Sequence, residues 1–380
     1  MELFIPDYLN TVIKTIENNN GEAYLVGGCV RDTLLNISPD DYDVTTSLLP
    51  EKITTIFEKT IATGLKHGTV TVISENKPIE VTTYRADGSY IDSRHPKKVS
   101  YVSNLNEDLS RRDFTINAMA YNHTSGLVDL FGGKEDLNKK IIRTVGNPND
   151  RFSEDALRIL RLFRFCAQLD FDAEAETLEA ALRLSHKLQN ISRERIATEL
   201  IKALLSSAPQ KLNPLLISDA LSFCGIPACS INKEFTFLPK EKYIRFAAFI
   251  ASSDGDAEEI CKNLKVENAL LKYCIELSQL LKKEITDKIS CKKALRDFSL
   301  KAVRDSIIIK GQSTETLELV IDSKEPYKIS HLAVNGNDLA ELKIQGKEIG
   351  STLSHLTDFV IKNPQYNTKE KLLNIVRNNI

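Results

Sequence analysis

Two aspartates, Asp41 and Asp43, follow a diglycine turn in the segment Pro39-Asp-Asp-Tyr-Asp-Val-Thr-Thr. The turn, Gly27-Gly-Cys-Val-Arg-Asp, predicts a strand, a tight turn and a helix N-terminus whose N–H groups can face a triphosphate. In a strand, residues two apart share a face, which would place Asp40 on the opposite one. Neighbouring carboxylates repel unless a cation lies between them, and Mg²⁺ takes one or two carboxylates plus phosphate oxygens. The pattern predicts a nucleotidyl-transfer site.

A third carboxylate, Glu80, lies within the apolar run Pro78-Ile-Glu-Val-Thr-Thr. An unpaired charge in such a strand is costly, so a functional role beside Asp41 and Asp43 is one interpretation. The three acids would then suit two-metal phosphoryl chemistry, in which one ion activates the attacking oxygen and the other steadies the leaving pyrophosphate. An edge-strand glutamate facing water is the other interpretation.

Five sequence blocks, in order, resemble the class II tRNA nucleotidyltransferases, the family of bacterial CCA-adding enzymes and poly(A) polymerases. They cover residues 21 to about 205, and a weaker match, Leu332-Ala-Val-Asn-Gly-Asn-Asp-Leu, follows near the C-terminus. The blocks are Gly27 to Asp43, Arg111-Arg-Asp-Phe-Thr-Ile-Asn-Ala-Met-Ala, Leu127-Val-Asp-Leu-Phe-Gly-Gly-Lys-Glu-Asp-Leu, Arg151-Phe-Ser-Glu-Asp-Ala-Leu-Arg-Ile-Leu-Arg-Leu-Phe-Arg-Phe and Ile191-Ser-Arg-Glu-Arg-Ile.

The resemblance implies a triphosphate site formed by the Gly28 backbone, Arg31 and Arg112. The planar fork of arginine suits phosphate better than the point charge of lysine. Asp113, next to Arg112, is interpreted as structural support, and Asn117 follows it by one helical turn, so both could share a face.

A helix over 151–165 carries Asp155, Arg158, Arg161 and Arg164 at intervals of three. Asp155 and Arg158 could together meet a base edge, because a carboxylate accepts from an exocyclic amine and a guanidinium donates to ring acceptors. Arg161 and Arg164 would lie closer to phosphate or to neighbouring acids. A plain ion-pair helix is the alternative. The resemblance favours nucleotide selection, first CTP and then ATP, without a template.

The segment 83–98, between Glu80 and Arg111, is polar and punctuated by Gly88 and Pro96. Such a segment beside a site is typical of a lid. Within the family, enzymes that add only the two cytidines lack an intact loop here, so the resemblance favours complete C-C-A addition.

The chain organisation predicts an α+β fold, in which strand-like and helical runs alternate to about residue 145 and helices follow. The resemblance implies a mixed-sheet, polymerase β-like nucleotidyltransferase head (1–145), then an all-α neck with the nucleotide-selecting helix (146–205), an RNA-binding body (206–315) and a tRNA-binding tail (316–380). Net charge is −2, but residues 281–310 hold nine Lys/Arg against four Asp/Glu. These could meet RNA phosphates or form a solvated, ion-paired helix face.

Cysteine and hydropathy patterns limit the class of protein. The seven cysteines have no C-x-x-C pair and no metal-ligand spacing with the six histidines, so no zinc site is expected. No signal peptide and no membrane-spanning apolar run is evident, and we expect a cytoplasmic location and no membrane partner.

The resemblance implies two additions of C and one of A to tRNA from CTP and ATP, with Mg²⁺, and a grip on the acceptor and TΨC arm. Three alternatives stay open. They are a partial (CC- or A-adding) enzyme or poly(A) polymerase, a small-molecule nucleotidyltransferase, and an inactive RNA-binding protein. The poly(A) members typically carry a strongly basic C-terminal extension, and this chain has a pI of about 6.4.

Overall fold

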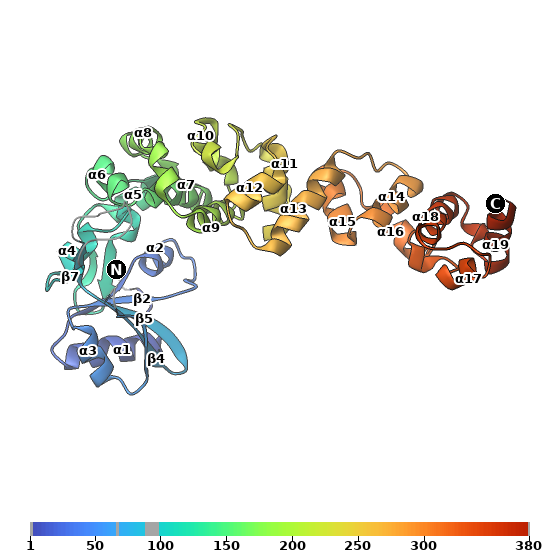
Figure 1. The fold of residues 1–380 in the computed structure, drawn as a ribbon. Helices are drawn as coiled ribbons and strands as arrows, with labels where there is room; N and C mark the ends of the chain where they lie inside the picture. Colours follow the sequence, from blue (N-terminus) through green and yellow to red (C-terminus); the bar gives the residue numbers. More distant parts are fainter. Residues whose placement is uncertain (1–2, 66–67, 88–98, 379–380) are drawn as a thin grey trace. The chain divides into compact units, whose positions relative to one another are not determined.

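The computed structural model describes residues 3–65, 68–87 and 99–378 (Figure 1). The chain divides into two compact units, Met1–Ile231 and Asn232–Ile380. Most of the segment that we expect to form a lid, 88–98, lies outside the described residues.

A seven-stranded mixed sheet forms the centre of the first unit, with strand order β3-β4-β5-β2-β1-β8-β9. The β2–β5 pair is parallel and the other pairs are antiparallel. Two further pairs of strands, β6-β7 and β10-β11, lie outside this sheet. The strands are β1 (Ala23–Val26), β2 (Asp43–Thr46), β3 (Thr60–Gly64), β4 (Thr69–Ser74), β5 (Lys77–Thr83), β6 (Arg85–Asp87), β7 (Val99–Tyr101), β8 (Met119–Asn122), β9 (Gly126–Asp129), β10 (Ile141–Ile142) and β11 (Asp172–Ala173).

Helices of the first unit flank this sheet and then continue beyond it. Figure 1 shows α1 and α3 beside β4, and both helices contact that strand. The helices are α1 (Asp7–Asn18), α2 (Gly28–Leu34), α3 (Pro50–Ile56), α4 (Leu105–Ser110), α5 (Gly133–Lys139), α6 (Pro148–Glu154), α7 (Leu157–Leu169), α8 (Ala175–Arg183), α9 (Arg193–Leu204) and α10 (Asn213–Ile217), with short 3₁₀ turns such as η2 (Thr115–Asn117).

The second unit is helical throughout its described residues, and no strand is assigned between 232 and 378. The α+β prediction, a mixed-sheet head followed by helices, is therefore confirmed. The helices are α11 (Lys242–Ser252), α12 (Ala257–Asn263), α13 (Asn268–Leu281), α14 (Lys288–Asp297), α15 (Leu300–Ile309), α16 (Glu315–Asp322), α17 (Gly336–Ala340), α18 (Lys347–Lys362) and α19 (Lys369–Asn378).

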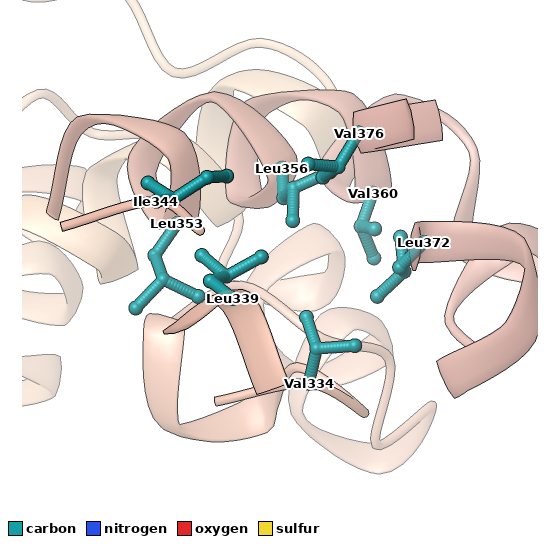
Figure 2. Close-up of a cluster of buried hydrophobic side chains, with 8 residues drawn as sticks. All are labelled: Val334, Leu339, Ile344, Leu353, Leu356, Val360, Leu372 and Val376. Atoms are coloured by element: carbon teal, nitrogen blue, oxygen red, sulfur yellow. The ribbon is translucent and has the colours of Figure 1, made fainter. Parts of the chain in front are cut away.

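A small apolar core holds the last helices together. Leu339 of α17, Leu356 and Val360 of α18, and Leu372 of α19 point into one cluster (Figure 2). A capping box stabilises the N-terminus of α17, in which the Asn335 side chain accepts from the backbone N–H groups of Asn337 and Asp338. The motif near the C-terminus that we matched to the family thus forms a helix start and part of this core.

The prediction of one helix over 151–165 is wrong in one respect, because the chain leaves the helical conformation at Asp155. Asp155 has an extended backbone (φ −140°, ψ 104°) and separates α6 from α7. Its carboxylate accepts from the Leu157 N–H at 2.9 Å, which supplies an acceptor for one of the unpaired N–H groups that begin α7. The three-residue spacing therefore does not run along one helix from Asp155, although Arg158, Arg161 and Arg164 do share α7.

No helix in the described residues combines the length and the apolar composition that a bilayer crossing requires.

Candidate active site

The predicted carboxylates come from two adjacent central strands of the sheet and from the segment before one of them. Asp43 begins β2 and lies directly opposite Glu80 of the parallel neighbour β5, so both side chains are on one face. Asp41 precedes β2 in irregular backbone rather than lying in the strand. Burial raises the pKa of Asp43, and the charges of Glu80 and Asp41 raise it further, against a lowering by Arg112. The three acids are thus close enough to repel, as predicted.

One surface hollow contains all three carboxylates. Asp41, Asp43 and Glu80 line it, and so does Asp40. The prediction that Asp40 faces away fails because residues 40 and 41 lie before the strand, where side chains do not alternate.

The carboxylates suit a hard, oxygen-seeking cation such as Mg²⁺. Relief of the repulsion that raises the pKa of Asp43 is the structural reason to expect a cation there. Within residues 3–65, 68–87 and 99–378, no three His, Cys, Asp or Glu side chains converge as a ready-made metal cage. Two carboxylates with phosphate oxygens and water would therefore complete the coordination.

The diglycine turn brings the three predicted triphosphate residues together. Gly27 has φ +75°, and a Cβ there would lie 3.1 Å from Arg112 Nη1. A Cβ at Gly28 would lie 3.6 Å from Arg31 Nη2. Glycine is required at residue 27 by its positive φ. The sequence pattern predicted this turn, and the structure shows that two guanidinium groups lie against it.

The Arg31 side chain forms short hydrogen bonds, whereas those of the Arg112 side chain are long. Arg31 donates to Asp32 Oδ1 and to Asn117 Oδ1, each at 2.8 Å. Arg112 donates to Asp108 Oδ2 at 3.3 Å and to the Asn117 carbonyl at 3.5 Å, and its buried Nε has no acceptor among the described residues. These long or missing bonds leave Arg112 able to bind an anion.

Asp108 is a site residue that the sequence reasoning missed. It is fully buried and accepts from Arg111, from Arg112 and from the Arg85 backbone N–H. Thr45 Oγ1, on the strand that carries Asp43, donates to it at 3.4 Å. Burial would raise the pKa of Asp108, but Arg111 and Arg112 hold that pKa below its usual value. Its spacing of three and four residues before these arginines is the signal that could have revealed it.

Asp113 supports Arg161 of α7. Its Oδ2 accepts from Arg161 Nε at 2.7 Å, and its Oδ1 accepts from Asn117 Nδ2 at 3.3 Å and from the Phe114 N–H. Burial would raise the pKa of Asp113, but Arg161 holds that pKa below its usual value. Asp113 and Asn117 do come together, across a loop and the 3₁₀ turn η2 rather than on one helix.

Phe165 joins the arginines into one cluster. The guanidinium carbons of Arg31 and Arg161 lie 5.3 Å from its ring centroid, and that of Arg164 lies 4.2 Å away. Arg164 also pairs with buried Glu199 of α9 at 2.7 Å. Sequence reasoning missed Phe165 and Glu199, because nothing local predicts that α2, α7 and α9 meet. A cation over an aromatic face gains about 0.5–2 kcal/mol, so this ring helps to position the cluster.

Asp155 and Arg158, which we predict to bind the base, form hydrogen bonds to other protein groups in this structure. Asp155 Oδ2 accepts from Arg195 Nη2 at 3.0 Å. Arg158 donates to Glu154 at 2.6 Å and to the Arg111 carbonyl at 3.0 Å, next to Arg112 in the chain. Recognition of a base by this pair stays a prediction. The bond to Arg111 does tie α7 to the segment that presents Arg112.

Comparisons with known proteins agree with this geometry. Residues 23–143 match the poly(A) polymerase head domain, and residues 170–221 match a probable RNA- and SrmB-binding site of polymerase A. The CCA-adding enzyme of Anoxybacillus flavithermus is 37% identical over 95% of this chain and 94% of its own length. That of Oceanobacillus iheyensis is 49% identical over 50% of this chain and 48% of its own.

A solved structure extends the match to the whole fold. The crystal structure of the Bacillus stearothermophilus CCA-adding enzyme in complex with CTP superposes with a TM-score of 0.83 at 29% identity, over 99% of both chains.

Proposed function

The chain belongs to the family of CCA-adding enzymes, and from that premise we propose that it adds C, C and A to the 3′ end of tRNA from CTP and ATP without a template. The observation that carries the proposal is the set of carboxylates on β2 and β5 beside a glycine turn covered by Arg31 and Arg112. Acids for a divalent cation and arginines for a triphosphate are the two needs of nucleotidyl transfer.

In the proposed reaction, the 3′-hydroxyl of tRNA attacks the α-phosphate of the nucleotide and pyrophosphate leaves. Gly28, Arg31 and Arg112 bind the triphosphate, and the weakly bonded Arg112 can shift from Asp108 to phosphate oxygens. Asp41 and Asp43, with Glu80 beside them, would hold Mg²⁺, which when bound would activate the hydroxyl and offset the charge of the leaving group. Asp108 holds Arg111 and orients Arg112 before the nucleotide binds, and Asp113 holds Arg161.

We propose that Asp155 and Arg158 select the base. Cytosine and adenine both present an amine beside a ring nitrogen, and one carboxylate with one guanidinium can bind that edge. For this, Asp155 must exchange Arg195 for the nucleotide, and Arg158 must exchange part of its bonding to Glu154. Arg161 and Arg164 support the site through Asp113, Glu199 and Phe165.

We assign the head, neck, body and tail to 1–145, 146–205, 206–315 and 316–380, with the helical body and tail holding the acceptor and TΨC arm. A-form RNA is recognised mostly by shape and backbone, which suits helices that carry lysines. A cytoplasmic location belongs to the same proposal, and all seven cysteines are free thiols, as is usual in a reducing compartment.

The test is extension of three tRNAs that end at the discriminator base, at C and at CC, each with CTP, ATP or both. The proposal predicts two additions with CTP alone, a third only when ATP is present, and no extension past CCA. A product that stops at CC with both nucleotides would show a partial enzyme, and a long run of A would show a poly(A) polymerase.

A further inference from the structure

The hollow that contains the carboxylates also contains aromatic and cationic groups to which the reaction above assigns no role. Tyr8 of α1, Tyr42 between the two aspartates, and Lys77 at the start of β5 line it. The Tyr8 and Tyr42 rings pack edge to face with their centroids 6.3 Å apart, and Lys77 Nζ lies 4.2 Å from the Tyr8 ring centroid. Together these three side chains form what we call the tyrosine platform.

Three separate elements position the tyrosine platform. Ser74 Oγ, at the end of β4, donates to the Tyr8 carbonyl at 2.9 Å and so fixes α1 to the sheet. Glu75 and Asn76, both with positive φ, make the tight turn that delivers Lys77 to the hollow. Tyr42 comes from the backbone that carries Asp41 and Asp43. The arrangement is therefore built around the carboxylates and not scattered over the surface.

The charge of Lys77 has no carboxylate partner among the described residues, although Asp40, Asp41, Asp43 and Glu80 line the same hollow. Lys77 is exposed, and both tyrosines are half-buried. An ammonium over the Tyr8 ring, which itself meets the Tyr42 ring, offers a phosphate contact beside an aromatic surface. This combination binds single-stranded nucleic acid. The hollow, about 470 Å³, lies within the roughly 300–1,000 Å³ usual for a small-ligand site.

The sheet order places the tyrosine platform and the arginines on opposite sides of Asp43. The hollow is lined from β4, β5, β2 and α1, whereas Arg31 and Arg112 cover the turn after β1, on the side of β8. In phosphoryl transfer the attacking and leaving oxygens are roughly in line through the phosphorus. If the arginines hold the departing pyrophosphate, the attacking hydroxyl must approach from the side of the hollow.

We propose that the tyrosine platform binds the 3′-terminal nucleotide of the tRNA primer, with Lys77 contacting its phosphate and the tyrosine rings contacting its base. This inference rests on the proposed function, because it assigns the primer end of the same reaction. Stacking tolerates any base, and a primer site that must accept the discriminator base, C and then C again needs that tolerance.

The test uses the full-length enzyme and measures separate KM values for tRNA and for CTP in single-nucleotide addition. We expect Lys77→Ala and Tyr8→Ala to raise KM for tRNA by about fivefold or more and to leave KM for CTP within about twofold. The rise in KM should be seen with tRNAs that end at the discriminator base, at C and at CC. Tyr8→Phe keeps the ring and should restore the tRNA KM. Lys14→Ala, an exposed lysine of the same helix α1 that does not line the hollow, is the matched control.

A second readout separates phosphate contact from structural support. Loss of one phosphate contact should lower the slope of log KM for tRNA against log salt by about 0.7 in Lys77→Ala, whereas a packing defect would leave that slope unchanged. A raised KM for CTP with unchanged KM for tRNA would place the nucleotide in the hollow and overturn the proposal. Unchanged KM values in folded, active Lys77→Ala would also overturn it. An inactive wild-type enzyme would instead contradict the proposed function itself.

Discussion

The ion pairs around α7 in the first unit are more buried than the Arg304–Glu318 pair of the basic segment in the second unit. In the first unit, Arg161 and Arg164 bind carboxylates that are nearly inaccessible, Asp113 and Glu199. In the basic segment 281–310 of the second unit, a typical pair is Arg304 with Glu318, and both side chains are nearly half exposed. The Arg161–Asp113 pair is also a hydrogen bond, which fixes the direction of that guanidinium group within the fold, as a reaction requires. Surface pairs are weak and screened by salt.

The basic segment also keeps lysines without such pairs. Lys282, Lys288 and Lys293 are exposed and have no carboxylate partner among the described residues. Lys292, by contrast, is buried and pairs with Glu325. Part of this segment is thus an ion-paired helix face, and contact of its remaining lysines with RNA phosphates stays a prediction.

The largest effect is expected at the carboxylates of the first unit. Asp41→Ala or Asp43→Ala should abolish addition of both C and A, by about a thousandfold or more, because every addition shares the cation site. Binding of tRNA should change little, since the proposed tRNA contacts lie mostly on the helices of residues 206–380. Primer extension and filter binding measure the two properties. Addition of C near the wild-type rate at saturating Mg²⁺ would contradict the assignment.

The next effect compares a buried pair with a surface pair. Asp113→Ala removes a buried carboxylate and leaves the half-buried Arg161 without its partner, so the free energy of unfolding should fall by about 1–3 kcal/mol. Glu318→Ala, the matched change at the Arg304 pair, should cost less than about 1 kcal/mol. Urea unfolding of both variants measures the difference. Equal losses would show that burial does not separate the two regions.

A fall in pH should destabilise the first unit through its buried aspartates. Arginines hold the pKa values of Asp108 and Asp113 below the ordinary 3.8. Their contribution to stability is therefore present above pH 3.8 and is lost as the pH falls through their lowered values. Asp113→Asn should lose less stability than wild type over that range. Thermal melting between neutral pH and pH 3 tests this, and parallel curves for the two proteins would contradict it.

The smallest effect is expected in the basic segment. Changing Lys282, Lys288 and Lys293 together to Ala should raise KM for tRNA a few-fold at low salt and should weaken its salt dependence, because each lost phosphate contact reduces the slope by about 0.7–0.9. KM for CTP should stay unchanged. Lys262→Ala, which removes a lysine already paired with Glu258 in α12, is the control and should have little effect.

Features set by neighbouring residues could be predicted from the sequence, whereas contacts between distant segments could not. The turn at Gly27 follows from a short-range pattern. Glu80 does lie opposite Asp43, on a strand inside the sheet, but it is exposed, and its role in the reaction stays a prediction. The break at Asp155 was missed because three-residue spacing reads as one helix, while its capping of Leu157 overrides that pattern.

Residues that join separate elements could not be found from spacing alone. Phe165 meets Arg31 across more than a hundred positions of sequence, and Glu199 reaches Arg164 from another helix. The tyrosine platform is of the same kind, because α1, the loop before β2 and the β4–β5 turn converge only in the folded sheet. Tertiary packing, rather than any motif, brings these groups together.

Nucleotide misincorporation tests most directly the central claim that separate side chains of the first unit read the base and the phosphates. Asp155→Ala should raise incorporation of UTP and GTP relative to CTP and ATP, because the lost bonds to the exocyclic amine remove discrimination. Arg112→Ala should weaken all four nucleotides alike, since phosphates carry no base identity. Single-nucleotide addition with each nucleotide separately gives both comparisons. An Asp155→Ala enzyme that is slower but as selective as wild type would contradict the claim.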